Sequence, residues 1–185
     1  RMIAVDLFAG GGGASTGIEE ALGRSVDIAI DHSPAAVAMH AANHPATKHY
    51  CEDVFDVDPR DVCGRRPVGL LWASPDCRHF SPAKGGKPCH PKVRSLPWEI
   101  TKWARQTKPR LICMENVPAM KTWGPLHGHH SHGCKSKAKL EDDDETWEKC
   151  ARKLCRFAKP IRKLAGTTWN EWIQAFKDLG YKVED

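Results

Sequence analysis

The sequence predicts a doubly wound α/β fold with a mostly parallel sheet, truncated before its last strands. Two observations predict it. Short apolar runs alternate with amphipathic stretches over residues 1–120, as strands and helices alternate in a sheet covered on both faces. The apolar runs also end at glycines or at single acidic residues, as expected of parallel strands that lead to a ligand-binding edge.

Strands are expected at the apolar runs, and helices at the stretches whose apolar residues recur every three or four positions. Glycine closes the first and last helices, at Gly23 and Gly180, and Pro34 opens the second, because proline fits a first helical turn. A segment rich in Pro, Gly and Lys predicts a long functional loop. In chain order, the expected elements are strand Met2–Phe8, helix Ser15–Leu22, strand Val26–Ile30, helix Pro34–Ala42, an acidic turn at 51–56, strand Val68–Ala73, loop Ser74–Val93, helix Trp98–Gln106, strand Arg110–Met114, helix Thr168–Leu179 and strand Tyr181–Val183.

Residues 121–165 differ in kind from this core. They combine His, Lys and Cys with the acidic run Glu141–Glu145 and the basic stretch Lys149–Lys163. We expect a partly mobile insertion here, between a cofactor-binding and catalytic core at 1–120 and a final segment, 166–185, with a helix and the start of a further core strand. The His and Cys spacing matches no zinc motif, so no metal is expected.

Composition places the chain among soluble globular proteins. It is 41% hydrophobic and 28% charged, and no apolar run approaches the roughly 20 residues of a membrane span. Its 8 cysteines are irregularly spaced, which favours free thiols in a reducing cytoplasm over a disulfide framework. We expect a cytoplasmic protein of a prokaryote or phage, with no membrane partner.

The net charge of +5 is unevenly distributed. Residues 1–62 carry 4 Lys and Arg against 10 Asp and Glu, whereas residues 63–140 carry 15 against 3. A middle third this basic indicates a polyanionic partner, because binding to phosphates releases counterions. A solvated basic face explains the charge equally well.

Two segments suggest a nucleoside-type ligand. Gly10–Gly13 follow the first strand, where glycines let the backbone turn sharply and approach a ligand. Asp31 ends the second strand at the right distance along the chain to accept from ribose hydroxyls. Asp53 could accept from an adenine amino group, and His32 could lie on the adenine ring. This pattern does not distinguish a dinucleotide from S-adenosylmethionine.

Two further residues suggest covalent chemistry. Cys77 follows the buried strand Val68–Ala73 at the ligand edge, where Arg78, His79 and Lys84 could favour its thiolate. Glu115 ends the next strand at the same edge, where a carboxyl group kept protonated by burial could donate to a ring nitrogen. A buried structural thiol and a salt-bridged glutamate are the alternatives.

These motifs, in this order, resemble the DNA cytosine-5 methyltransferase family. Asp6–Gly13 (DLFAGGGG) is similar to the family's first motif, Asp31 with Asn43 to its second, and Glu52-Asp53-Val54 to its third. Asp76–Ser81 (DCRHFS) resembles the Pro-Cys-Gln-x-Phe-Ser catalytic motif, and Glu115-Asn116-Val117 the Glu-Asn-Val motif. The resemblance covers residues 3–120, with a weaker likeness at Leu179–Val183.

The resemblance implies a Rossmann-like methyltransferase that uses S-adenosylmethionine, releases S-adenosylhomocysteine and acts on double-stranded DNA, as in restriction–modification. It implies that Cys77 adds to carbon 6 of a flipped cytosine and that Glu115 stabilises the adduct. The loop after Cys77 would close over DNA. The residues implied to contact the cofactor are Phe8, Ala9, Gly10, Gly11, Gly13, Asp31, His32, Asp53 and Val54. Those implied to contact DNA are Arg78, Ser81, Lys84, Gly85 and Lys87.

Three departures qualify the resemblance. Asp76 stands where the family has proline before the nucleophile, and Arg78 where it has Gln. The later motifs and the target-recognition domain are absent, so we expect activity only with a missing C-terminal part, which a second chain could carry. The leading alternative is a non-catalytic module that binds S-adenosylmethionine or DNA or regulates a methyltransferase. An RNA cytosine methyltransferase and, more remotely, a nicotinamide-dependent oxidoreductase are further readings.

Overall fold

The computed structural model describes residues 1–81, 89–126 and 160–184. The chain folds as two compact units. The first comprises Arg1–Asp76, Leu96–Asn116 and Ala175–Asp185, and the second comprises Cys77–Ser95 and Val117–Gln174. Among the described residues, no helix is long and apolar enough to cross a membrane.

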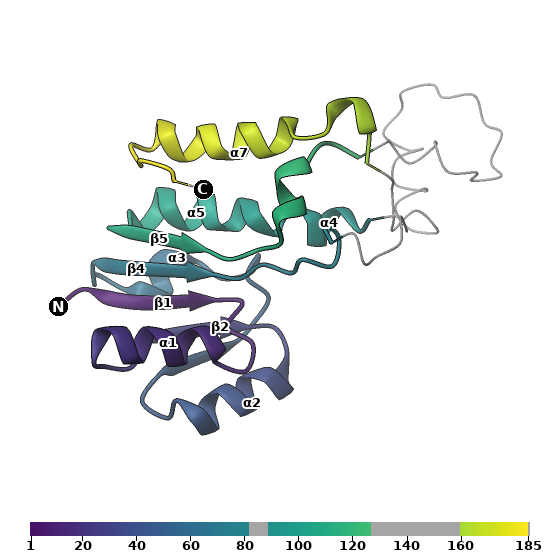
Figure 1. Cartoon of the computed structure of the whole chain (residues 1–185). Helices are drawn as coiled ribbons and strands as arrows, with labels where there is room; N and C mark the ends of the chain where they lie inside the picture. The colour runs from purple at the N-terminus through teal and green to yellow at the C-terminus, as the bar shows by residue number, and fades with distance from the viewer. Residues whose placement is uncertain (82–88, 127–159, 185) are drawn as a thin grey trace, which may run out of the picture. The chain divides into compact units, whose positions relative to one another are not determined.

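The first unit is built on a five-stranded parallel sheet in the order β3-β2-β1-β4-β5. Figure 1 shows the arrows of β1, β4 and β5 running in one direction. The central strand β1 is buried at every position, as expected of the middle strand of a parallel sheet covered on both faces. The strands are β1 Ile3–Leu7, β2 Ile28–Asp31, β3 Lys48–Cys51, β4 Val68–Ala73 and β5 Leu111–Met114.

The strand order reverses between β1 and β4. The chain moves outward from β1 to β2 and β3, then returns to pair β4 on the other side of β1. Ligands of doubly wound folds bind beyond the carboxyl ends of the strands at such a switch point. The glycine turn follows β1 and Ser74 follows β4, and the Ser74 backbone N–H donates to Leu7 O at 3.2 Å. The fold therefore brings two of the predicted motifs to one edge.

The helices begin and end where local chemistry allows it. Ser33 caps α2 by accepting from the Ala36 N–H at 3.4 Å, with proline in the first turn. Gly23 closes α1 in the left-handed conformation. The helices of the first unit are α1 Gly13–Leu22, α2 Pro34–Asn43, α3 Pro59–Cys63 and α5 Leu96–Thr107, and α7 Thr167–Asp178 runs from the second unit into the first.

The second unit is organised around aromatic side chains. The Trp123 ring lies edge-on to the Phe80 ring, with centroids 5.7 Å apart, and 6.3 Å from the Trp172 ring. The Trp169 N–H donates to Trp123 O at 3.0 Å. Its short helices are α4 Pro91–Arg94, η2 Pro118–Thr122 and η4 Arg162–Leu164.

The doubly wound parallel fold is confirmed, with four corrections to its elements. Residues 181–184 have no strand assignment, so the expected strand Tyr181–Val183 is wrong: a strand needs a hydrogen-bonded ladder, and the described residues give it none. Strand β3 and helix α3 were not predicted, because Lys48–Cys51 is polar and α3 is only five residues long. The expected loop over 74–93 ends in helix α4. Most of the expected insertion lies outside the described residues.

Candidate cofactor and nucleophile sites

The turn after β1 takes backbone conformations that favour glycine. Gly10 and Gly12 have φ angles of 53° and 98°, in the left-handed region where a Cβ is strained. Phe8 also has a positive φ, 60°, although it carries a large side chain. A Cβ at Gly10 or Gly13 would meet nothing within 4 Å, whereas one at Gly11 would lie 2.6 Å from the Met39 sulfur. The turn therefore has open space beside Gly10 and Gly13, whereas the Met39 side chain packs against Gly11.

Asp31 ties this turn to the end of β2. One carboxylate oxygen accepts from the Gly10 N–H at 3.0 Å, and the other from the Ser33 N–H at 2.8 Å. The expected acceptor for a ribose is thus already engaged with backbone. A carboxylate has about four acceptor sites, so two hydrogen bonds leave capacity for a ligand hydroxyl. Asp31 both shapes the turn and remains able to accept.

The remaining cofactor candidates lie on neighbouring turns. The His32 side chain is 78% exposed, with Nδ1 3.6 Å from an Asp31 oxygen, so it is free to lie on a ligand ring. Asp53 accepts from the Phe55 N–H at 3.2 Å in the turn after β3. Ala9 and Val54 are buried, which makes them packing residues as much as contact residues.

A chain of hydrogen-bonded polar groups, buried except for the half-buried His49, was not predicted. His40 is 1% exposed. Its Nδ1 lies 2.8 Å from His49 Nε2, and its Nε2 lies 3.0 Å from Ser15 Oγ. Ser15 in turn donates to Asp6 at 2.8 Å. The chain links β1, α1, α2 and β3, and three of its four members looked like ordinary helix or strand residues in the sequence.

Burial moves two pKa values of this chain in directions that favour neutral groups. Burial, then the nearby charges of His44 and His49, lowers the pKa of His40 from 6.5 to about 4. Burial raises the pKa of Asp6 from 3.8 to about 6, against the Ser15 hydrogen bond and the charge of His44, which lower it. Nearby Asp31 raises it slightly further.

These two shifts act on stability in opposite senses between about pH 4 and pH 6. Between these pH values, His40 is protonated in the unfolded protein and neutral in the folded protein. Asp6 is protonated in the folded protein and ionised in the unfolded protein. We expect Asp6→Asn to expose the His40 contribution, so that the free energy of unfolding falls as pH drops from 6.5 to 4. We expect His40→Gln to expose the Asp6 contribution, so that the free energy of unfolding rises as pH drops from 6 to 3.8. Each slope approaches about 1.4 kcal/mol per pH unit relative to wild type.

Urea unfolding at half-unit pH steps measures both slopes. Thr47→Val is a suitable control, because Thr47 is buried nearby and the substitution removes only the hydroxyl, which donates to Val26 O at 2.8 Å. Parallel pH profiles for the wild type and both variants would show that neither group titrates differently on folding.

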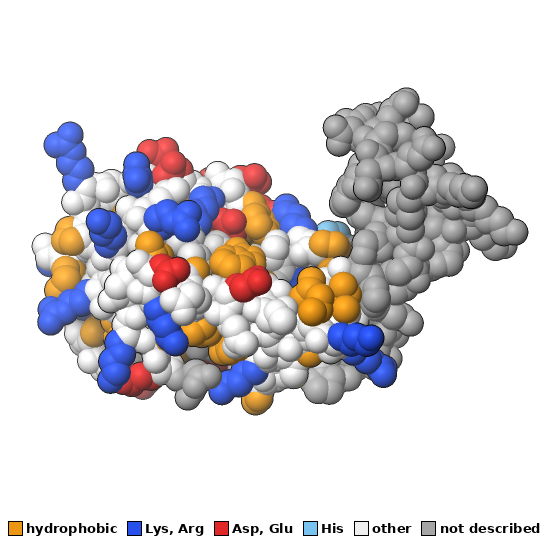
Figure 2. Space-filling view, turned by 90° about the horizontal axis from the view of Figure 1, so that it is seen from above, with side chains coloured by type: hydrophobic (Ala, Val, Ile, Leu, Met, Phe, Trp, Pro, Cys, Tyr) orange, Lys and Arg blue, Asp and Glu red, His pale blue; other side chains and the backbone are white. Residues whose placement is uncertain are grey.

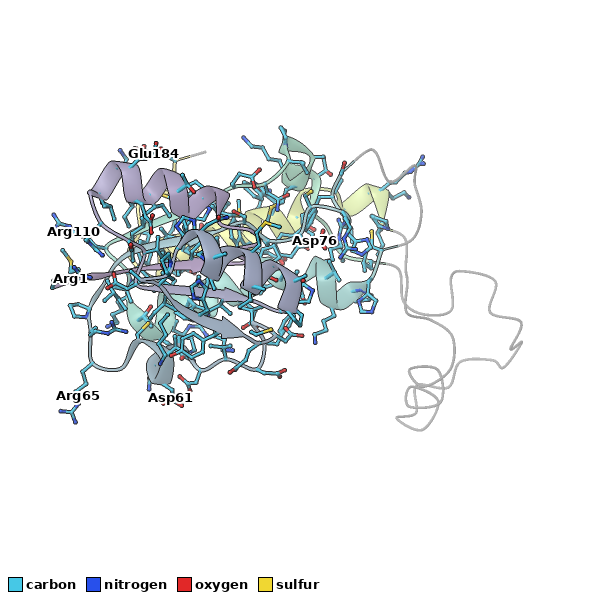
Figure 3. All side chains as sticks on the ribbon, turned by 90° about the horizontal axis from the view of Figure 1, so that it is seen from below. Arg1, Asp61, Arg65, Asp76, Arg110 and Glu184 are labelled. Atoms are coloured by element: carbon cyan, nitrogen blue, oxygen red, sulfur yellow. The ribbon has the colours of Figure 1, made fainter. Side chains whose placement is uncertain are left out.

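The exits of β4 and β5 lie side by side in the first unit. The Glu115 N–H donates to Ala73 O at 3.0 Å, and Asn116 Nδ2 donates to Pro75 O at 2.8 Å. Figure 3 shows Asp76 at the opposite end of this unit from Arg1 and Arg110, as its position after β4 requires. Glu115 is exposed, so the expectation that this carboxyl group is buried is wrong for the described residues.

Cys77 begins the second unit and opens a tight turn. Its carbonyl oxygen accepts from the N–H groups of Phe80 and Ser81, both at 2.9 Å. The thiol is free and partly exposed, as a nucleophile must be and a structural thiol usually is not. Cys77 and Glu115 belong to different units, so the expectation that they lie close together stays a prediction.

Arg94, the last residue of α4, contacts this turn and was not identified from the sequence. It is 5% exposed, and its Nη1 donates to His79 O at 2.8 Å and lies 3.6 Å from Cys89 Sγ. Its guanidinium carbon lies 5.0 Å from the centre of the Phe80 ring, close enough for a cation–π contact. Burial lowers its pKa, and it forms no ion pair with a described acidic group. Only its presence near Cys89 in the sequence could have suggested a link to the nucleophile turn.

The structure describes only two of the five residues predicted to contact DNA. Arg78 is exposed and Ser81 partly exposed, whereas Lys84, Gly85 and Lys87 lie outside the described residues. On the face drawn in Figure 2, Lys and Arg side chains are interspersed with Asp and Glu. Arg65 and Arg110 lie at the far end of the first unit from Asp76 (Figure 3). These two basic residues therefore lie away from the ligand edge.

A sequence model of C-5 cytosine-specific DNA methylases matches residues 2–129. The chain therefore belongs to this family. The matched segment includes the glycine turn, Asp31, Cys77 and Glu115.

Curated relatives agree with this assignment. The chain is 30% identical to the Type II methyltransferase M.XorII of Xanthomonas oryzae pv. oryzae over 125 residues, which are 65% of this chain and 29% of that protein. It is 34% identical to the Type II methyltransferase M.AgeI of Thalassovita gelatinovora over 85 residues, which are 43% of this chain and 20% of that protein. The chain thus spans less than a third of the length of these relatives.

Solved structures share the fold. A protein assigned as a DNA modification methyltransferase of an E. coli prophage superposes with a TM-score of 0.56 and 26% identity, over 65% of this chain and 33% of that one. The Dnmt2 methyltransferase of S. pombe gives a TM-score of 0.50 at 22% identity, over 66% of this chain and 36% of that one. These superpositions agree with a Rossmann-like methyltransferase fold.

Proposed function

We propose that this chain carries the cofactor-binding and nucleophile-bearing part of an enzyme that methylates carbon 5 of cytosine in double-stranded DNA. The observation that carries the proposal is the family match over residues 2–129, which includes both reactive candidates, Cys77 and Glu115. The methyl group would come from S-adenosylmethionine and leave S-adenosylhomocysteine. The recognition of a target sequence would depend on residues outside this match, in the same protein or in a second chain.

The residues of the first unit fit such a cofactor. The glycine turn presents backbone with open space above Gly10 and Gly13, and Asp31 keeps acceptor capacity beside it. His32 offers an exposed ring to stack on adenine, and Asp53 an acceptor for its amino group. We propose Phe8, Ala9, Gly11 and Val54 as the surrounding contacts.

The proposed chemistry uses Cys77 as a nucleophile. Its thiolate adds to carbon 6 of a cytosine turned out of the duplex, and Glu115 donates a proton toward ring nitrogen 3, so that carbon 5 becomes nucleophilic. Carbon 5 accepts the methyl group, a base removes the carbon-5 proton, and the carbon 6–sulfur bond breaks to release Cys77 as thiolate, while ring nitrogen 3 returns its proton to Glu115. Arg78 and Ser81 are proposed to contact the DNA near the flipped base, together with Lys84, Gly85 and Lys87.

The cofactor assignment predicts a specific loss for Asp31→Ala. The variant loses the acceptor for a ribose and the two backbone hydrogen bonds that shape the turn. We expect the affinity for S-adenosylmethionine to fall by about 1–3 kcal/mol, the cost of lost hydrogen bonds to a charged group. Calorimetric titration of the full-length protein measures the change.

Asp58→Ala is the matched control. Asp58 caps α3 by accepting from the Arg60 N–H at 2.7 Å, so it also bonds local backbone but lies outside the turn. Asp58→Ala should bind like wild type. Equal affinities for wild type and Asp31→Ala would remove Asp31 from the site, and no binding by wild type would overturn the proposed function.

A further inference from the structure

The carbonyl oxygen of Gly12 is held by three donors. The Thr16 N–H lies 2.9 Å from it, Thr16 Oγ1 3.0 Å and His44 Nε2 3.1 Å. The first two belong to the start of α1, but His44 reaches the turn from the residue after α2. Because a carbonyl oxygen only accepts, His44 Nε2 must carry the proton.

Glu19 holds the other side of the His44 ring. Its Oε2 lies 3.1 Å from His44 Nδ1, which is ion-pair distance, although the angle does not make a hydrogen bond. His44 is 4% exposed, so neither ring nitrogen can turn to water instead. The ring therefore has one orientation available, with Nε2 on the turn and Nδ1 toward α1.

The ring also fills the space beside Gly12. A Cβ at Gly12 would lie 2.5 Å from His44 Nε2 and 2.6 Å from Cδ2, closer than real side chains approach. Asn43, the last residue of α2, adds a weaker hold on the same turn, since its Nδ2 lies 3.4 Å from Gly11 O. The end of α2 thus contacts two successive carbonyls of the glycine turn.

The hold on the Gly12 oxygen determines where the next N–H points. No peptide bond of the described chain is cis, and in a trans peptide the C=O of one residue and the N–H of the next point in opposite directions. With the Gly12 oxygen turned toward His44, the Gly13 N–H points away from it. Gly13 is exposed and is the first residue of α1, where backbone N–H groups have no partner within the helix.

We propose that His44, held by Glu19, is a positioning residue for the cofactor turn. It fixes the Gly12 carbonyl and so directs the Gly13 N–H toward the open face of the turn, where S-adenosylmethionine binds. The inference rests on the proposed function, and it assigns a role to a histidine 32 positions along the chain from the glycine that it contacts.

The test compares three variants of the full-length protein by calorimetric titration with S-adenosylmethionine. His44→Leu fills the space but donates nothing, and we expect its affinity to fall about tenfold. His44→Gln can still donate to Gly12 O, and we expect its affinity to stay within about threefold of wild type. Thr47→Val removes the hydroxyl that donates to Val26 O and keeps the backbone N–H that donates to His44 O, so this variant should bind like wild type.

Steady-state methylation separates positioning from general damage. Misdirection of the turn raises KM for the cofactor in His44→Leu and leaves kcat at saturation unchanged. A purely structural role lowers kcat through the active fraction and leaves KM unchanged. Where His44→Leu fails to fold by circular dichroism, Glu19→Ala replaces it, and we expect about a threefold loss of affinity because no side chain then fixes the Nδ1 side of the ring.

The outcomes distinguish the two proposals. Wild type that binds no S-adenosylmethionine overturns the proposed function and this inference with it. Wild type that binds, with His44→Leu equal in affinity to Thr47→Val, overturns the positioning role alone. A loss in His44→Leu that His44→Gln does not recover also contradicts it, because packing rather than the donated hydrogen bond would then decide affinity.

Discussion

Cys77→Ser is expected to abolish covalent capture of DNA that contains 5-fluorocytosine. Fluorine cannot leave carbon 5 as a proton does, so the adduct formed by wild type persists after methyl transfer and survives denaturation. A serine hydroxyl is far less ionised than a thiol at neutral pH, so the variant forms no adduct. The full-length protein is incubated with S-adenosylmethionine and a duplex copied with 5-fluorocytosine at every cytosine, because the target sequence is unknown, and is then run on a denaturing gel.

Cys51→Ser provides the control for this experiment. Cys51 is an exposed free thiol at the end of β3, so its loss tests whether any accessible thiol captures the DNA. Cys51→Ser should capture like wild type. Capture that persists in Cys77→Ser would show that Cys77 is not the nucleophile, and a wild type that binds DNA and cofactor without capture would favour a non-catalytic binding module.

Glu115→Gln is expected to slow adduct formation by on the order of a hundredfold to ten thousandfold, the usual contribution of a positioned proton donor. The amide keeps the size of the side chain but cannot give up a proton to the ring nitrogen. Cofactor affinity should stay within about twofold, since the amide also preserves the turn after β5. Time courses of capture measure the rate, and titration measures the affinity.

The neighbouring carboxylate supplies the comparison for Glu115. Asp76 ends the segment that leaves β4, at the same end of the first unit, and Asp76→Pro should capture DNA at the wild-type rate or faster. A Glu115→Gln rate equal to that of wild type would remove Glu115 from the chemistry. Because the Glu115 side chain is exposed in the structure, the rate of the Glu115→Gln variant tests directly whether this carboxyl group takes part in the chemistry.

The sequence predicts the parts of the fold that local pattern determines. The strand Val68–Ala73 was predicted with its observed bounds, because a run of apolar residues between polar segments has few other places to lie. Strand β3 escaped prediction because Lys48–Cys51 lies at the sheet edge, where a polar surface is tolerated. The strand expected at Tyr181–Val183 rested on local pattern alone, and strand formation also requires a partner.

The sites divide in the same way. The glycine turn, Asp31 and the exits of β4 and β5 could be predicted, since the carboxyl ends of neighbouring parallel strands share one edge. Three features could not be predicted: the contact of His44 with Gly12, the polar chain from His49 to Asp6, and the hydrogen bond from Arg94 to the nucleophile turn. Each joins side chains that are distant along the chain, and each depends on burial that no spacing rule reveals.

The identity of the methylated base tests the proposed reaction most directly. Full-length protein is incubated with duplex DNA and S-adenosylmethionine carrying a labelled methyl group, and the DNA is digested to nucleosides and separated by chromatography with mass detection. We expect the label to appear in 5-methylcytosine and to be lost in Cys77→Ser. Label in N4-methylcytosine or in methylated adenine, which need no cysteine adduct at carbon 6, would contradict the proposed reaction.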